Sequence, residues 1–240
     1  MEIDEFSKEL TKLASKIEIE LSLDEIEKLY KFMYLLLEWN EKINLTAITE
    51  PEDIILKHFV DSITIKKYIK SENKVLDMGT GAGFPGIPLK IISSDTYFTL
   101  VDSLNKRIIF LNEVCDKLKL NKIENIHSRA EELAKNKKYR EQYDVVTSRA
   151  VARLASLVEY MLPFVKVGGR CICMKGSNVD EELIEAKKAI NVLGGEIEKV
   201  DKFLLPNSDI ERNIVIIKKI KNTSCKYPRK PGTATKQPII

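Results

Sequence analysis

Cysteine and histidine are scarce in this chain of 240 residues, and their spacing does not indicate a metal site. The four cysteines are Cys115, Cys171, Cys173 and Cys225. None of them forms the paired CxxC spacing of a zinc site. Cys171 and Cys173 lie two residues apart in a strand-like segment, so both should face one side of it as small buried residues. Since His58 and His127 are the only histidines, we predict no metal.

Long apolar runs are also missing. No stretch approaches the run of about 18 apolar residues that a membrane-spanning helix needs. The first ten residues, MEIDEFSKEL, are acidic and lack the basic and then apolar pattern of a signal peptide. The composition, 44% hydrophobic and 31% charged, is ordinary for a globular protein with a buried core. We therefore expect a cytoplasmic protein that has no membrane partner.

Acidic residues are absent after Glu211, although the net charge of the whole chain is only +3. The cations that follow are Arg212, Lys218, Lys219, Lys221, Lys226, Arg229, Lys230 and Lys236. A basic tail without compensating acids suits a polyanionic partner. A solvated tail that merely aids solubility fits the same charge pattern.

The first 70 residues have the apolar spacing of helices. Steps of three and four residues between apolar side chains predict helices over 4–17, 24–39 and 51–69. Ser22, followed by Glu25, forms the capping-box pattern before the second of these helices. Pro51 suits the first turn of the third helix.

From residue 74 onwards, short apolar runs alternate with amphipathic stretches. Strands are predicted at 74–78, 97–102, 122–128, 143–149 and 169–176, with helices at 85–93, 105–119, 129–138, 151–163 and 179–193. This alternation predicts an α/β fold with a mostly parallel, doubly wound sheet. Two further strands at 196–206 and 212–220 have only a short link between them, so they must form an antiparallel hairpin. We expect three parts: a helical segment over 1–70 packed on the core, a cofactor-binding domain over 71–220, and a basic tail over 221–240.

The most informative segment is the glycine-rich turn VLDMGTGAGFPGIPL, which begins at Val75. Residues 81–86 fit the dinucleotide fingerprint GxGxxG, while residues 77–83 fit DxGxGxG, which looks like the first motif of class I methyltransferases. The preceding 73 residues of helix, the proline at position 85 and the terminal hairpin favour the second template. We therefore predict S-adenosylmethionine as the cofactor, with a nicotinamide-dependent oxidoreductase as the alternative.

The spacing around this turn assigns roles to further residues. Glycines permit a left-handed backbone and a close approach of ligand, so Gly79, Gly81 and Gly83 should give space to the methionine part of the cofactor. Asp102 ends the second strand, where its carboxylate can accept bonds from both ribose hydroxyls. Ser103 and Leu104 should flank the ribose and adenine. Ala130 and Glu131 are placed to reach the adenine edge. The alternative is that they only begin a helix, with an acidic residue in its first turn.

The segment after the fourth strand, YDVVTSRAVARL, restricts the methyl acceptor. It lacks the (Asp/Asn)-Pro-Pro-aromatic motif typical of enzymes that methylate exocyclic amines. No cysteine nucleophile for pyrimidine C5 lies between Cys115 and Cys171, and the three-cysteine cluster of radical enzymes is missing. These absences indicate an acceptor that is already nucleophilic.

Several segments together resemble one family. They are DMGTGAGFPGIPL, LVDS, SRAEEL, TSRAVARL, WNEKINLTAIT followed by HFVDSI, and the tail YPRKPGTATKQPI. The chain is similar over nearly its whole length to the RsmG family of bacterial small-subunit ribosomal RNA (guanine-N7) methyltransferases, also called the glucose-inhibited division protein B family. The resemblance implies methylation of N7 of one guanine in small-subunit (16S) ribosomal RNA. It also implies that Gly79, Phe84, Ala130, Glu131 and Arg149 contact S-adenosylmethionine.

The chemistry of guanine N7 agrees with the absence of an obvious base. N7 has a free lone pair and no proton, so the enzyme needs mainly to align N7 with the methyl carbon and the sulfur. Because the product base is cationic, Arg149 and Arg153 should hold a phosphate or the cofactor carboxylate rather than touch N7. Ordinary surface charge at a helix start is the alternative for both arginines.

Five further residues are predicted to serve the RNA. Arg229, Lys230 and Lys236 lie among prolines, in a segment that should stay extended and follow a phosphate backbone. Asn44 and His58 should contact RNA or shape the pocket, with a purely structural role as the alternative for each. Removal of residues 226–240 should then weaken RNA binding and leave cofactor affinity nearly unchanged. We expect a monomer that acts on naked RNA or on a partly assembled subunit; a non-catalytic RNA-binding module with a vestigial fold is a further alternative.

Overall fold

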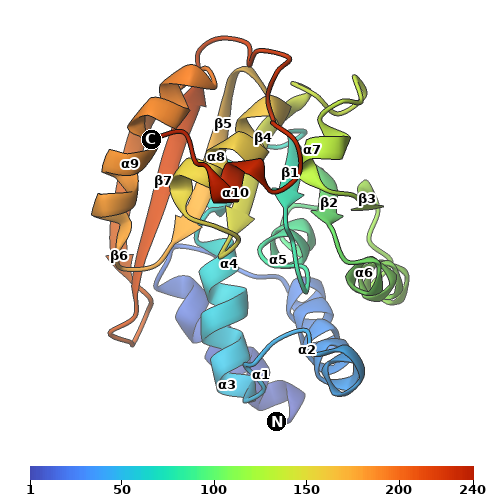
Figure 1. Cartoon of the computed structure of the whole chain (residues 1–240). Helices are drawn as coiled ribbons and strands as arrows, with labels where there is room; N and C mark the ends of the chain where they lie inside the picture. The colour runs from blue at the N-terminus through green and yellow to red at the C-terminus, as the bar shows by residue number, and fades with distance from the viewer.

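A computed structural model describes all residues from Met1 to Ile240 and contains one seven-stranded sheet (Figure 1). The strands are β1 (Lys74–Met78), β2 (Tyr97–Asp102), β3 (Ile123–His127), β4 (Tyr143–Arg149), β5 (Val165–Lys175), β6 (Gly195–Leu204) and β7 (Glu211–Lys219). Their order in the sheet is β3-β2-β1-β4-β5-β7-β6. The first five strands pair in parallel, whereas β7 is antiparallel to both β5 and β6. The predicted fold class, with its reversed terminal hairpin, is confirmed.

Each face of the sheet is covered by its own set of helices, because successive strand residues point to opposite faces. Val75 packs with α5 (Gly86–Ile91), α6 (Asn105–Lys117) and the N-terminal helices, in one hydrophobic cluster. Leu76 packs with α7 (Ala130–Leu133), α8 (Leu154–Met161) and α9 (Val179–Val192), in a second cluster. Cys171 and Cys173 both lie buried in the second cluster, as their spacing predicts.

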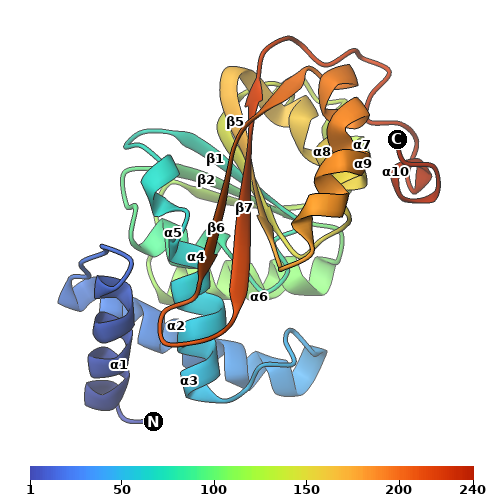
Figure 2. The ribbon, with the colours of Figure 1, turned by 90° about the vertical axis from the view of Figure 1, so that its left-hand side faces the viewer.

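The N-terminal helices lie beneath the sheet as Figures 1 and 2 draw it. They are α1 (Ile3–Ser15) and α2 (Leu23–Ile43), followed by α3 (Pro51–Ile54), a π-helix (Ile55–Val60), α4 (Asp61–Ile63) and a 3₁₀ turn (Lys66–Tyr68). The capping box of Ser22 and Glu25 is present, with a distance of 2.7 Å from Ser22 N to the Glu25 carboxylate. The predicted single helix over 51–69 is thus interrupted by a π-helical stretch, a feature that often occurs at functional sites. Apolar spacing alone does not reveal it.

Two connections near the carboxyl ends of the strands also differ from the sequence prediction. The helix predicted over 129–138 is reduced to α7, and α8 begins three residues later than the predicted residue 151. The reason for the late start is a turn in which Ala150 has φ +57°. A left-handed backbone cannot continue into a right-handed helix, so the chain loops outward before α8.

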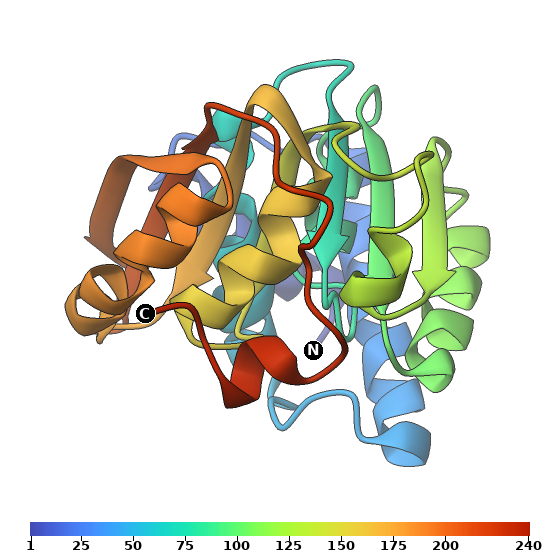
Figure 3. The ribbon, with the colours of Figure 1, turned by 45° about the horizontal axis from the view of Figure 1, so that its top comes forward.

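The C-terminal tail folds back across α7 and α8, as the red segment in Figure 3 shows. The Arg140 guanidinium donates hydrogen bonds to the carbonyl oxygens of Thr223, Ser224 and Tyr227 at 2.9 to 3.1 Å. The short helix α10 (Thr233–Lys236) then packs on α8, where the Ser156 hydroxyl donates to the Ala234 carbonyl at 2.8 Å. The tail is therefore a packed strap rather than the extended arm predicted from its prolines.

The structure contains no helix long and apolar enough for a membrane span. It also contains no group of three or more His, Cys, Asp or Glu side chains arranged to hold a metal ion.

Candidate functional site

A cavity of about 630 Å³ opens at the carboxyl ends of β1, β2 and β4. This is the edge of a parallel sheet at which α/β proteins bind ligands, and the volume suits a small-molecule site. The predicted cofactor residues that line it are Gly79, Gly81, Phe84, Asp102, Ser103, Ala130, Glu131 and Arg149. His58, predicted for RNA or pocket shape, lines it as well. The turn and these later segments are thus brought together around one cavity.

The three glycines of the turn have different surroundings. All three have positive φ, at +70° for Gly79, +62° for Gly81 and +91° for Gly83. A Cβ on Gly79 would lie 2.6 Å from Val151, whereas a Cβ on Gly81 would meet no protein atom within 4 Å and would project into open space. A Cβ on Gly83 would lie 2.6 Å from Ile87, so this glycine serves helix packing and does not line the cavity.

Asp102 is 3% exposed and anchors the turn through its carboxylate. Its Oδ2 accepts the Gly81 N–H at 2.9 Å and an Arg107 N–H at 3.2 Å, while Oδ1 accepts the Leu104 N–H at 2.9 Å. A carboxylate has about four lone-pair positions, so it retains capacity for a hydroxyl donor. The Leu104 side chain is 43% exposed and does not line the cavity, so its place beside the adenine stays a prediction.

Asp77 closes the turn from beneath. Its Oδ2 accepts the Thr80 hydroxyl at 2.6 Å and the Gly86 N–H at 3.0 Å, while its buried Oδ1 has no partner. Complete burial raises the pKa of Asp77 to about 7, against the opposing effect of the two hydrogen bonds. The residue that begins the DxGxGxG pattern thus holds the backbone of the turn and does not line the cavity.

The tail forms part of the cavity wall. Glu131 is 7% exposed, and its Oε1 accepts the Gly232 N–H at 3.2 Å. Gly232 and Tyr160 both line the cavity beside it. These contacts were not predicted, because Gly232 lies a hundred residues after Glu131 and its sequence context has no ligand-binding pattern.

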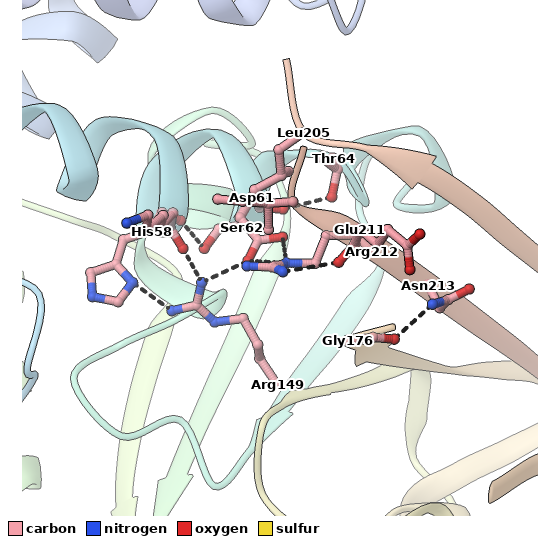
Figure 4. A network of polar contacts seen from close by, with 12 residues as sticks. His58, Asp61, Ser62, Thr64, Arg149, Gly176, Leu205, Glu211, Arg212 and Asn213 are labelled. Carbon is pink, nitrogen blue, oxygen red and sulfur yellow. Dashed lines mark hydrogen bonds and ion pairs between the residues drawn. The ribbon is translucent and has the colours of Figure 1, made fainter. Parts of the chain in front are cut away.

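Arg149, at the end of β4, lies between this first cavity and the N-terminal helices (Figure 4). Its guanidinium donates to the Lys57 carbonyl at 2.8 Å and approaches His58 Nδ1 at 3.0 Å. His58 Nε2 lies 2.9 Å from the Thr46 hydroxyl, and the imidazole stacks on Phe84 with centroids 4.3 Å apart. Burial and the charge of Arg149 lower the pKa of His58 to about 3, so the ring is neutral at pH 7.

Asp61 is 2% exposed and joins two arginines that are far apart in the chain (Figure 4). Its carboxylate accepts bonds from Arg149 at 3.2 Å and from Arg212 Nε at 3.1 Å. Two cations thus share one carboxylate, and the cluster keeps an excess positive charge. Arg212 was predicted only as one cation of the basic tail; its place at the start of β7 puts it here.

A second cavity, of about 560 Å³, adjoins the first. The two share His58, Arg149 and Ala150 in their walls. The second cavity extends from this shared wall to the end of β5, where Lys175 lines it, and to the first turn of α9, where Glu182 lines it. Its charged residues come from four separate segments of the chain.

The remaining predicted RNA residues lie outside both cavities. Asn44 is an exposed C-cap of α2 with φ +47°. Arg153 is exposed and binds Glu185 of α9 at 2.8 Å. Lys230 and Lys236 are exposed and have no ion pair, whereas the guanidinium of Arg229 binds the buried carboxylate of Glu159 at 2.7 Å.

Comparison with known proteins identifies relatives over nearly the whole chain. The family model described as "rRNA small subunit methyltransferase G" matches residues 25–215. A protein of Clostridium novyi named ribosomal RNA small subunit methyltransferase G is 53% identical over 95% of this chain and 94% of its own length. A protein of the same name from Acetivibrio thermocellus is 51% identical over 99% of this chain and 100% of its own length. An S-adenosylmethionine-dependent methyltransferase structure from Aquifex aeolicus shares the fold, with a TM-score of 0.53 and 18% identity over 70% of this chain and 93% of its own.

Proposed function

This chain belongs to the rRNA small subunit methyltransferase G family, and we propose that it transfers a methyl group from S-adenosylmethionine to N7 of a specific guanine in small-subunit (16S) ribosomal RNA. The observation that carries this proposal is the family match over residues 25–215, which includes every residue that lines the cavity at the carboxyl ends of β1, β2 and β4 except Gly232. The match decides between the two readings of the glycine-rich turn in favour of the methyltransferase motif.

The residues around the first cavity fit S-adenosylmethionine by their donors, acceptors and open space. We assign Asp102 to the ribose, because its carboxylate lies at the end of β2 and keeps one lone-pair position for a hydroxyl donor beside the three protein donors that it already accepts. Gly79 and Gly81 leave room for the methionine part of the cofactor, since the position above Gly81 is free of protein atoms. Glu131 and Ala130 form the wall assigned to the adenine, beside Met78 and Val101.

The proposed reaction needs no general base from the protein. S-adenosylmethionine would supply a methyl group on a positively charged sulfur: the lone pair of guanine N7 would form the bond to the methyl carbon, while the electrons of the carbon–sulfur bond stay on the sulfur of the departing S-adenosylhomocysteine. His58 is held neutral between Arg149 and Thr46, so the ring orients the Arg149 side chain instead of accepting a substrate proton. The enzyme then contributes mainly by holding N7 in line with the methyl carbon, which is catalysis by proximity and orientation.

We also propose a cytoplasmic monomer that acts on ribosomal RNA, with the three-part organisation of helical segment 1–70, cofactor domain 71–220 and tail 221–240. The location follows from the proposed substrate. The exposed cations Lys230 and Lys236, and the exposed Asn44 and Arg153, remain the proposed surface contacts with RNA. Arg229 is the exception, because its guanidinium already binds Glu159.

The direct test is incubation with labelled S-adenosylmethionine and unmodified small-subunit ribosomal RNA, followed by mass spectrometry of nucleosides and fragments. We expect label in 7-methylguanosine at one position. Gly81→Asp should abolish cofactor binding, because its side chain would fill the open space above the turn. Gly168→Asp is the matched control: Gly168 also has positive φ and open surroundings, but it lies outside the cavity. Label in any other nucleoside, or none, contradicts the proposal.

A further inference from the structure

We propose that the second cavity binds the target guanosine nucleotide, and that Lys175 and Glu182 recognise the Watson–Crick edge of its base. The inference rests on the proposed function, since it names where the methyl acceptor of that reaction lies. Three observations support the inference: the position of the cavity, its charge, and the donors and acceptors in its wall that have no protein partner.

The position of the cavity satisfies the geometry of direct methyl transfer. The acceptor atom must lie about 3 to 3.5 Å from the methyl carbon, so the acceptor site must adjoin the cofactor site. The second cavity meets the first at His58, Arg149 and Ala150. Ala150 has φ +57° although it is not glycine, and such strain is concentrated at functional sites. This turn lies between the end of β4 at Arg149 and the start of α8 at Leu154.

The volume and charge of the cavity suit a nucleotide. Its 560 Å³ falls within the range of small-molecule sites. The cations in its wall are Lys57, Arg149, Lys175 and Arg212, and the carboxylates are Asp61 and Glu182. The excess of cations matches the phosphate groups on either side of a nucleoside in RNA. Proteins that recognise an RNA sequence usually bind bases that are unstacked from their neighbours.

The floor of the cavity contains an ion pair with unused hydrogen-bonding capacity. Lys175 Nζ lies 2.7 Å from Glu182 Oε2 and donates to the Ala152 carbonyl at 2.8 Å. Oε2 also accepts the Leu154 N–H at 2.7 Å, at the start of α8. The two side chains are only 11% and 16% exposed. An ammonium has three protons and a carboxylate has two accepting oxygens, so one proton of Lys175 and Oε1 of Glu182 have no protein partner.

This pair is complementary to guanine rather than adenine. Guanine presents the acceptor O6 beside the donors N1–H and N2–H, which match the ammonium of Lys175 and the carboxylate of Glu182 respectively. Adenine presents a donor and an acceptor in the opposite order. Reading a base by its Watson–Crick edge is common for nucleotides drawn out of a stack. It also leaves N7, which lies next to O6 on the Hoogsteen edge of the base, without a hydrogen-bond partner and free to face the methyl group.

Glu182→Gln tests the carboxylate while keeping its structural bond. The glutamine oxygen can still accept the Leu154 N–H, which turns its amide NH₂ toward the base and places donor against donor. We expect kcat/KM for RNA to fall by about tenfold to a hundredfold, the usual effect of losing a paired base contact. The Kd for S-adenosylhomocysteine should stay unchanged. Glu198→Gln is the matched control, because Glu198 also binds a cation, Arg170 at 2.6 Å, but lies outside both cavities. Equal effects of the two substitutions on kcat/KM would overturn the assignment.

A second measurement alters the RNA, and its first part uses only the unaltered protein. Inosine at the methylated position lacks the N2 amino group but keeps N7. We expect kcat/KM to fall by about tenfold for the inosine substrate, and the fall to be smaller for Glu182→Gln than for the parent protein. No loss with the parent protein, or the same loss in both proteins, would refute recognition by Glu182. A parent protein that never produces 7-methylguanosine would instead refute the proposed function, so the two failures are distinguishable.

Discussion

Replacing Arg229 with methionine removes the guanidinium that binds the buried carboxylate of Glu159. That carboxylate is 1% exposed and accepts bonds from Arg229 Nε, from its terminal nitrogen at 2.7 Å, and from its backbone N–H at 2.7 Å. Methionine keeps the aliphatic length of the side chain and the backbone bond. The substitution therefore isolates the ion pair that fastens the tail to α8.

The magnitude follows from the charge that is left behind. Removing one partner of a buried ion pair costs about 3 to 5 kcal/mol, because the other charge stays in a poorly solvated place. Arg229 itself is 26% exposed, so we expect a value near the lower limit, about 3 kcal/mol. The tail is held by further contacts at Arg140 and Ser156, which should keep the rest of the molecule folded. The loss should then appear as local opening of the tail over 226–236.

Opening of the tail should weaken cofactor binding. The Gly232 N–H holds the Glu131 carboxylate at the cavity wall, and a hydrogen bond to a charged group contributes about 1.5 to 3 kcal/mol. Losing this positioning should raise the Kd for S-adenosylhomocysteine by about tenfold or more. This reverses the expectation from the sequence, which predicts that the tail serves RNA and leaves the cofactor unaffected.

Isothermal titration with S-adenosylhomocysteine measures the effect, and hydrogen exchange of the tail amides shows whether opening is local. Lys230→Met is the control, because Lys230 lies next in the chain and has an exposed side chain that forms no ion pair. The double variant Arg229→Met with Glu159→Gln should recover part of the stability, since no buried charge remains. An unchanged or lower Kd for Arg229→Met would refute the role of the tail in the cofactor cavity.

Three further predictions concern single side chains. The pKa of His58 is lowered to about 3, so acid should destabilise the protein between about pH 6.5 and 3, and His58→Asn should reduce this loss in pH-dependent urea unfolding. The pKa of Asp77 is raised to about 7, so its effect has the opposite sign: stability should be lost as pH rises from 4 through 7, by on the order of 4 kcal/mol at most. The free energy of unfolding of Asp77→Asn should not show this decrease with pH. Arg153→Ala breaks only an exposed ion pair with Glu185, so the free energy of unfolding, measured by thermal unfolding, should change by less than about 1 kcal/mol. Filter binding then measures the effect of the same substitution on RNA affinity.

The fold was readable from the sequence because its signals are local. Consecutive apolar residues such as Val75 and Leu76 predict a strand with two covered faces, and Figure 1 shows helices on both. The capping box at Ser22 and the glycine-rich turn use residues within ten positions of one another. The cofactor cavity was predicted for the same reason, since the ends of parallel strands always meet at one edge of the sheet.

Contacts between distant charged residues could not be predicted in this way. Asp61 binds arginines that follow it by 88 and 151 residues, and Glu159 binds an arginine 70 residues later. A charged side chain in a sequence has dozens of possible partners, and spacing does not select among them. The π-helical stretch at His58 and the left-handed turn at Ala150 are likewise set by the contacts around them.

The C-terminal tail shows most clearly which features the sequence determines and which depend on the tertiary structure. Its sequence determined that it is basic, rich in proline and free of acids, which indicates a polyanion as partner. Only the tertiary structure decided that Arg229 neutralises a buried carboxylate and that Gly232 completes the wall of the cofactor cavity. The physical reason is desolvation: Glu159 is costly to bury alone, so the chain folds its own cation back onto it. The composition of a segment gives its charge, while the tertiary structure determines which group each charged side chain contacts.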